Sequence, residues 1–328
     1  MQRVYLDQNM WIYLACAYHG RARREGDREV LEFVIDAVER GLASFPLAAW
    51  NYMDLFKNRD AGRRARLGEV MHLVSCLHSI AHPTVLVPAE IEVALNRWFG
   101  RPSQLASPRV FGIGVNHAFG QPPVDFAEAL ELTPPSQRTR LRDEWMALYE
   151  RSVLLGVPAS APQWERGFQA IIANTEAYAD AETHRTELFH AWGRTDDRLD
   201  RLVVGVGIHD IIQPLIACFD RVRLSFEAFI DLGRDEVTRF FRELPIASAL
   251  TDLKGTAYPN AQRRWQTGDL NDLSAASLSI VHCDVVAIEK HWGAAVKRAG
   301  LDGKHGTMVV TDLASLPEAL ITGSRLGS

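Results

Sequence analysis

The sequence predicts an α/β fold, in which a largely parallel sheet carries helices on both faces and a mostly helical insertion interrupts it. Short apolar runs alternate with helix-like segments near both ends of the 328-residue chain. This alternation is typical of parallel sheets. Between the ends, helix-like segments follow one another without clear strands. We therefore expect one split domain over residues 1–100 and 236–328, and a helical insertion over residues 101–235.

The N-terminal part of the split domain opens with a strand. "RVYL" at 3–6 reads as a short buried strand, and "NMWIYLACAYHG" as the helix after it, with Asn9 as a side-chain cap. The next elements are a helix in "DREVLEFVIDAVERG" that ends at Gly41, a short strand or extended segment in "ASFPLAAW", a helical pattern over 51–80 with a break near Gly62, and an extended piece in "TVLVPAE".

The predicted insertion begins after Gly100, where the alternation of strand-like and helix-like segments stops. "RPSQLASPRVFGIG" and "GVPASAPQW" are loop-rich, and "QRTRLRDEWMALYERSVLLG" and "FQAIIANTEAYADAETHRTELFHAWG" are helical. Strand and helix signals return in "DEVTRFFREL", "DLNDLSAASLSIVH", "CDVVAI", "EKHWGAAVKRAG", "TMVVT" and "SLPEALI". These last segments complete the predicted sheet and its covering helices.

Composition narrows the classes of function. The net charge of −5 argues against nucleic-acid binding through bulk positive charge, but it leaves room for a local basic groove. We see no apolar run of the ~18 residues that a membrane span needs and no signal peptide, so we expect a cytoplasmic protein that does not enter a membrane. The four cysteines form no CxxC pair, and we expect reduced, mostly buried thiols.

Two acids follow predicted strands at the point where each strand ends. Asp7 comes directly after "VYL", and Glu289 directly after "DVVAI". Because the carboxyl ends of parallel strands meet at one edge of a sheet, we expect both side chains in the same crevice. Carboxylate oxygens are the ligands that Mg²⁺ and Mn²⁺ prefer. The sequence thus predicts a divalent metal site at this edge.

Two further acids reach the same edge in this interpretation. Asp54 lies one turn into the helix after "FPLAAW", and Asp272 opens the helix that leads to the Glu289 strand. Asn9 and Asp269 are auxiliary candidates, and for Asp269 we favour the alternative that it is a loop residue. Taken singly, these acids read as helix caps, solvated helix residues or surface charge. Taken together they favour a metal site, since four carboxylates without a cation repel one another.

These motifs resemble those of the PIN-domain nucleases. "VYLDQN" is similar to their opening strand and Asp, "NYMDLFK" to the segment with their second acid, "NDLSAASL" to their third motif and "VVAIEKHW" to their fourth. The resemblance covers about the first 90 and last 90 residues. It implies a PIN-like three-layer α/β/α fold in which Asp7, Asp54, Asp272 and Glu289 bind Mg²⁺ or Mn²⁺. It also implies phosphodiester hydrolysis, with RNA favoured over DNA as the substrate, and by analogy a toxin or defence role.

The resemblance leaves alternatives open. Asp54 stands where Glu is more usual and Glu289 where Asp is more usual, which fits a catalytically inactive PIN-like module that binds RNA or a protein. A haloacid-dehalogenase-like phosphohydrolase is a weaker alternative, because Asp7 is followed by Gln8 and Asn9 rather than by a DxD motif. The insertion would select substrate, bind a protein partner or inhibitor, or mask the site.

Basic residues that follow the acids are candidates for substrate contact: Arg63, Arg64, Lys290 and His291. Two other acids are excluded from the site. Asp284 begins the strand that Glu289 ends, so five residues at ~3.3 Å each put it about 16 Å away. Asp312 ends a peripheral strand.

Overall fold

The computed structural model describes residues 1–101, 108–122, 126, 130–131, 133–155, 162–191 and 196–326. It describes the side chains of these residues except in 162–175, 196–198 and 323–326. Much of the two predicted loop segments, 102–107 and 156–161, lies outside the described residues.

The strands are short and the helices dominate. The strands are β1 (Gln2–Leu6), β2 (Ala43–Ser44), β3 (His78–Ile80), β4 (Phe111–Ile113), β5 (Val285–Ala287) and β6 (Met308–Val310). The helices of the first half are α1 (Gln8–Tyr18), α2 (Asp27–Glu39), α3 (Ala49–Lys57), α4 (Ala61–Ser75), α5 (Pro83–Trp98), α6 (Gly114–Ala118) and α8 (Pro135–Leu155). Those of the second half are α9 (Pro162–Ala191), α10 (Asp196–Asp210), α11 (Ile212–Val222), α12 (Phe226–Ile230), α13 (Arg234–Arg242), α14 (Pro245–Ala257), α15 (Thr267–His282), α16 (Lys290–Arg298), α17 (Leu301–His305) and α18 (Leu316–Leu326), with a 3₁₀ turn at Leu313–Ser315.

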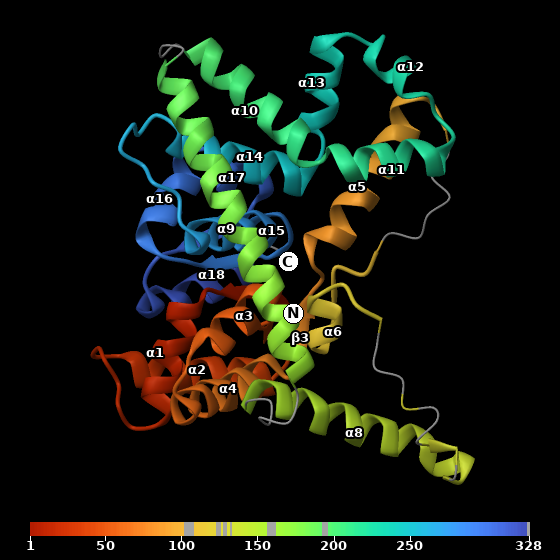
Figure 1. Cartoon of the computed structure of the whole chain (residues 1–328). Coiled ribbons are helices and arrows are strands. Elements are labelled where there is room, and N and C mark those ends of the chain that lie inside the picture. Colours follow the sequence, from red (N-terminus) through yellow and green to blue (C-terminus); the bar gives the residue numbers. More distant parts are fainter. Residues whose placement is uncertain are drawn as a thin grey trace.

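A parallel sheet lies in the half of the molecule built from both chain ends (Figure 1). Its order is β2-β1-β5-β6, so β1 and β5 are neighbours although 278 residues separate Leu6 from Asp284 in the sequence. The register pairs Val4 with Val285 and Leu6 with Ala287. The residues that follow these strands, Asp7 and Glu289, therefore emerge at the same edge.

Alternate residues of β1 and β5 pack into two separate hydrophobic cores. Val4, Leu6 and Val285 are buried with the apolar faces of α1, α2, α4 and α18. Tyr5 and Val286 point the other way and are buried with residues of α5, α14, α15 and α16. The central strands thus have helices on both faces, which explains why their sequences are continuously apolar.

A second, antiparallel pair lies beside this sheet. β3 pairs with β4, and the main chain at Leu47 bonds to His78 and Ile80 on the other side of β3, with N···O distances of 2.9 and 3.0 Å. Leu47 follows β2, so these two bonds link the antiparallel pair to the parallel sheet. β4 lies within the predicted insertion, where we expected no strand.

Two predicted local structures are wrong. "TVLVPAE" is not extended but forms most of the first half of α5, because His82 caps this helix and Pro83 occupies its first turn, where a missing N–H costs nothing. The helical pattern over 51–80 is broken at 58–60, close to Gly62 as expected, and Asp60 caps the new helix. The pattern ends early, however, at Ser75, and β3 follows.

The other described elements of the predicted insertion are helices, and they pack on helices from the two ends of the chain. α8 lies against α4, α11 against α5, and α10 against α14. The long α9 crosses the front of the molecule in Figure 1 and also contacts α15. All four cysteines are free: Cys218 and Cys283 are buried, Cys16 is half-buried, and Cys76 is exposed, contrary to expectation.

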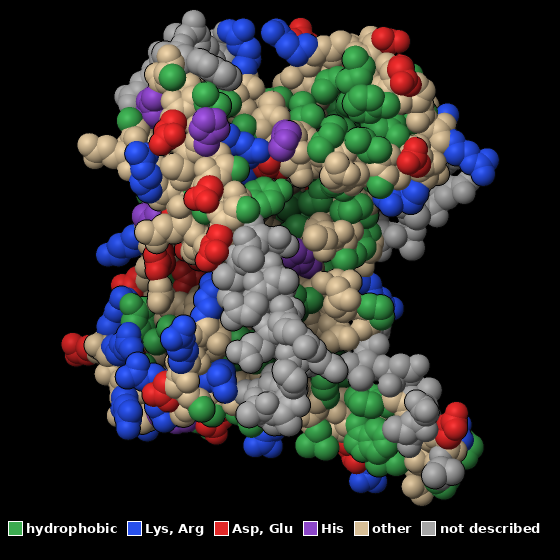
Figure 2. Space-filling view, in the orientation of Figure 1, with side chains coloured by type: hydrophobic (Ala, Val, Ile, Leu, Met, Phe, Trp, Pro, Cys, Tyr) green, Lys and Arg blue, Asp and Glu red, His purple; other side chains and the backbone are tan. Residues whose placement is uncertain are grey.

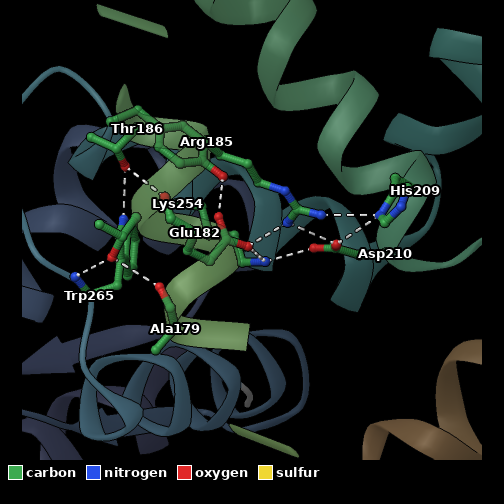
Figure 3. A network of polar contacts seen from close by, with 10 residues as sticks. Ala179, Glu182, Arg185, Thr186, His209, Asp210, Lys254 and Trp265 are labelled. Carbon is green, nitrogen blue, oxygen red and sulfur yellow. Dashed lines mark hydrogen bonds and ion pairs between the residues drawn. The ribbon is translucent and has the colours of Figure 1, made fainter. Parts of the chain in front are cut away.

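A buried polar network joins three of these helices (Figure 3). Lys254 of α14 donates to Glu182 of α9 and to Asp210 of α10, both at 2.6 Å. Arg185 also contacts both acids, at 2.7 and 3.1 Å, and the Tyr258 hydroxyl donates to Glu182 at 2.6 Å. Two cations thus balance two carboxylates, as burial of such groups requires.

In the part of the chain that the structure describes, no single helix is both long and apolar enough to cross a membrane. Leu199–Asp210 and Ile212–Val222 reach that length and composition only as a pair bent by 59°.

Candidate metal centre

Asp7 caps α1 and is anchored to the end of the sheet. Its main-chain N–H donates to the carbonyl oxygen of Ala287 at 2.9 Å. Its Oδ1 atom accepts the N–H groups of Asn9 at 2.7 Å and Met10 at 3.4 Å. The predicted cap at Asn9 is therefore wrong, because Asp7 occupies that position. The cap fixes the Asp7 carboxylate at the carboxyl edge of β1.

Glu289 joins Asp7 at this edge. Its main-chain N–H donates to Asp7 Oδ2 at 3.1 Å, and the Asn9 side-chain amide donates to its Oε1 atom. Asn9 thus contacts one of the predicted acids, as its auxiliary role requires. Asp7 accepts main-chain bonds at both oxygens and still keeps acceptor capacity, since a carboxylate has about four lone-pair sites.

Asp54 is positioned by the buried side chain of Asn51. The Asn51 amide donates to the carbonyl oxygen of Leu6 at 3.2 Å, and its oxygen accepts the N–H of Ala48 at 2.9 Å. These two bonds tie the first turn of α3 to the last residue of β1. Asp54 lies three residues after Asn51 on α3, where it forms an ion pair with Lys57 at 2.7 Å.

Asp272 reaches the site from α15, which packs against α3. We expected Asp272 to open this helix. The helix begins at Thr267 instead, so Asp272 lies in its second turn. The indole N–H of Trp292, on α16, donates to Asp272 Oδ2 at 3.2 Å. Trp292 is itself only 3% exposed, so a rigid neighbour orients this carboxylate.

The four acids share one electrostatic environment. Burial first, and then the charges of Asp7, Asp54 and Glu289, raise the pKa of Asp272 to about 7, against the lowering effect of the Trp292 hydrogen bond. Burial, with Glu289, raises the pKa of Asp7 to about 6 despite its main-chain hydrogen bonds. Such shifts mark carboxylates that lack a compensating cation.

The pKa of Tyr5 also indicates that the acids lie close to one another. This fully enclosed residue of β1 has a pKa raised by burial first and then by the charges of Asp7, Asp272 and Asp54. Acids from the first and last parts of the chain therefore gather around the end of β1. In Figure 2, acidic side chains also cluster where the molecule narrows between its two halves.

The donor chemistry at this edge fits a hard divalent cation, because every candidate ligand is a carboxylate or amide oxygen. In the present conformation, however, no three Asp, Glu, His or Cys side chains among the described residues are close enough together to surround one ion. Binding Mg²⁺ or Mn²⁺ thus requires these side chains to rotate inward. The attraction of each carboxylate to the cation would favour that rotation and offset the mutual repulsion of the acids.

The auxiliary acid has another role. Asp269 lies in the first turn of α15, where its Oδ2 atom accepts the N–H of Gln266 at 2.9 Å and its Oδ1 atom pairs with Arg263 at 2.7 Å. It stabilises the start of the helix that carries Asp272. The expectation that it is a loop residue is wrong.

The predicted substrate-contact residues divide into two groups. Arg63 pairs with Asp60 at the start of α4, and Arg64 donates to the carbonyl oxygen of Asn58. Neither contacts any of the four acids. Of the other pair, His291 lies 3.4 Å from Glu289 (Nδ1 to Oε2), and Lys290 is exposed at the start of α16.

Three residues that organise the site were missed: Asn51, Trp292 and Arg263. Asn51 could have been found from the sequence, because it is a polar residue three positions before the candidate ligand Asp54, and residues at this spacing share one face of a helix. The contact of Trp292 with Asp272 has no comparable local signal, since 20 residues separate the two.

No protein-family model matches the chain, and neither the curated proteins nor the solved structures gave a significant match.

Proposed function

We propose that the chain is a Mg²⁺- or Mn²⁺-dependent nuclease of PIN-like three-layer architecture that cleaves RNA. The observation that carries the proposal is the electrostatic coupling of Asp272 to Asp7, Asp54 and Glu289 at one sheet edge. These acids come from both ends of the chain. Lys57 pairs with Asp54 alone, and the negative charge that remains at this edge is costly for a fold unless a cation binds there.

The site offers the parts that metal-assisted phosphodiester hydrolysis needs. A bound ion supplies an activated water and neutralises charge on the scissile phosphate. Asp7, held by main-chain N–H groups, and Asp272, held by Trp292, present oriented oxygen ligands. Asn9 holds Glu289 beside them. These contacts hold three of the four carboxylates at one sheet edge, so that rotation of their side chains would complete a metal site.

Cleavage of a labelled single-stranded RNA tests the proposal. The wild type should cleave with Mn²⁺ and stop when EDTA removes it. Asp7→Asn should be at least about 100-fold slower, the upper end of the losses seen when only an outer partner of a metal ligand is removed. A DNA strand of the same sequence shows whether the ribose matters.

Asp284→Asn is the matched control, because Asp284 lies at the opposite end of β5 and accepts the N–H of Arg3. It should cleave at the wild-type rate. Equal, metal-independent cleavage by wild type and Asp7→Asn would overturn the proposal.

A catalytically inactive RNA- or protein-binding module is the second candidate. It is favoured by one observation, namely that no three candidate ligands among the described residues already surround an ion site. RNA binding without cleavage by the wild type, in Mg²⁺ and in Mn²⁺, would select this candidate.

A further inference from the structure

A cavity of about 440 Å³ lies beside the four acids, between the loop that leads into α15 and the exposed side of α16. Its polar lining comprises Thr256, Asn260, Arg263, His291 and Arg298, and Trp292 forms part of its wall. We call it the flanking pocket. Its volume lies in the range of about 300–1,000 Å³ that small-ligand sites occupy.

Two contacts connect the flanking pocket to the acids. Trp292 donates its indole N–H to Asp272 at 3.2 Å, so the pocket wall is one hydrogen bond from a candidate metal ligand. His291 lies 3.4 Å from Glu289 and packs against the Trp292 ring, with ring centroids 4.3 Å apart. A ligand that spans both places would pass over Trp292 and His291.

The charge of the flanking pocket is opposite to that of the acid cluster. Among the described residues that line it, none is acidic. Arg298 is exposed and makes no hydrogen bond or ion pair with a described residue, so its charge is available to a ligand. The lining therefore favours an anion.

Arg263 adds a second available donor. Its guanidinium lies over the rings of Trp265 and Trp292, at 5.0 and 5.3 Å, and pairs with Asp269 on one side. Its Nε atom is buried and has no hydrogen-bond partner. Stacking on two rings holds the planar guanidinium in place, and such a group is well suited to phosphate oxygens.

A neighbouring cavity of about 550 Å³ provides a contrast. It shares Thr256 and Arg298 with the flanking pocket, but Asp200 and Asp252 also line it. Both acids pair with Arg242, whose charge is therefore neutralised. Arg298 borders both cavities, and only in the flanking pocket do Arg263 and His291 join it without an acid in the lining.

We propose that the flanking pocket binds the phosphate of a nucleotide next to the cleaved bond, in single-stranded RNA. This inference rests on the proposed nuclease function. The acid cluster repels the RNA backbone, so cations beside it are needed to hold the strand. Arg298 and Arg263 supply them within reach of the site. A cavity of this size admits one nucleotide of a single strand, whereas a duplex would remain outside.

Binding can be measured apart from cleavage. The probe is a fluorescein-labelled single-stranded RNA of eight nucleotides, titrated in EDTA with Asp7→Asn protein and followed by fluorescence anisotropy. In this background, Arg298→Ala should raise the Kd about 5- to 10-fold. It should also reduce the slope of log Kd against log salt by about 0.7, the value for one phosphate contact on a single strand.

Lys297→Ala is the control, because Lys297 is the neighbouring exposed cation on α16 and does not line the flanking pocket. It should change the Kd less than twofold. Equal effects of the two substitutions, or no effect of either, would overturn the proposal. So would AMP that competes at concentrations comparable to the RNA, since the pocket would then serve a free nucleotide.

The two proposals can fail separately. If the wild type cleaves RNA but Arg298→Ala binds RNA as Lys297→Ala does, the flanking pocket is refuted and the nuclease function stands. If Arg298→Ala selectively weakens RNA binding while the wild type cleaves nothing, the pocket is supported and the nuclease function fails.

Discussion

Asp7 and Glu289 are joined by a hydrogen bond, 3.1 Å from the Glu289 nitrogen to Asp7 Oδ2, across 282 residues of sequence. The bond follows from the parallel pairing of β1 with β5, since Asp7 is the first residue after β1 and Glu289 the second after β5. Each acid also has a local role, Asp7 as the cap of α1 and Glu289 as the residue before α16. Structural and proposed functional roles therefore coincide at this junction.

Asp272→Asn should separate stability from activity. The pKa of Asp272 is about 7 in the folded chain, above the ordinary value of 3.8. The native state therefore binds more protons than the unfolded chain between about pH 4 and pH 7, and the free energy of unfolding falls as pH rises through this window. Without metal at pH 8, Asp272→Asn should raise the Tm by about 1–3 °C, because a repelled charge is removed.

The same variant at pH 5 is its own control. Asp272 is then largely protonated in the folded wild type but ionised in the unfolded chain, so the gain in Tm should be clearly smaller than at pH 8. Calorimetry at both pH values provides the measurement, and an RNA cleavage assay should show activity lost at pH 8. A variant less stable than wild type at pH 8 would show that the carboxylate contributes to the fold as a charge.

Lys254→Met should strongly destabilise the helical half of the molecule. The substitution leaves two carboxylates, the fully buried Glu182 and Asp210, to share the single permanent cation of Arg185 (Figure 3). Breaking a buried ion pair in this way costs about 3–5 kcal/mol. Urea denaturation followed by circular dichroism measures the loss.

The matched variant is Lys254→Met combined with Glu182→Gln, which removes one charge of each sign. It should recover part of the lost stability, because fewer buried charges remain unpaired. If the single variant unfolds at the same urea concentration as wild type, the network does not hold α9, α10 and α14 together.

Gly68→Ala tests the packing of α8 on α4. A Cβ atom at Gly68 would lie 1.9 Å from the carbonyl oxygen of Leu154, so the two helices must separate to accept it. Overpacking of this kind costs about 1–3 kcal/mol. The measurement is the free energy of unfolding in urea.

Gly205→Ala, in α10, is the control, because nothing lies within 4 Å of the added atom. It should stabilise the chain by about 0.5–1 kcal/mol through helix propensity. If Gly68→Ala were stabilising to the same extent, α8 would not pack on α4 as described.

The sequence predicted the central strands because their residues are buried on both faces and therefore continuously apolar. Val4, Leu6 and Val285 are all fully buried. The same rule failed for "TVLVPAE", whose apolar residues belong to a helix that packs against α11. A short apolar run cannot be assigned by periodicity alone, and here the cap at His82 decides.

The part of the site that lies at strand ends and near helix starts was predictable from the sequence. Asp7 and Glu289 follow from strand pairing, which a sequence pattern can indicate. Trp292 and Arg263 could not be found this way, since their roles depend on side chains that meet only in the folded chain. The contact of Arg263 with the Trp292 ring, 5.3 Å to its centroid, has no sequence signature.

Titration of the metal-free protein with Mn²⁺ tests the central claim most directly, namely that these four acids share a divalent cation. Isothermal titration calorimetry at pH 7.5 should show Mn²⁺ binding by the wild type and by Asp284→Asn. Asp7→Asn and Asp272→Asn should each weaken the affinity at least about 10-fold, since removing even an outer partner of a ligand costs 10- to 100-fold. Equal Mn²⁺ affinity in all four proteins would contradict the account.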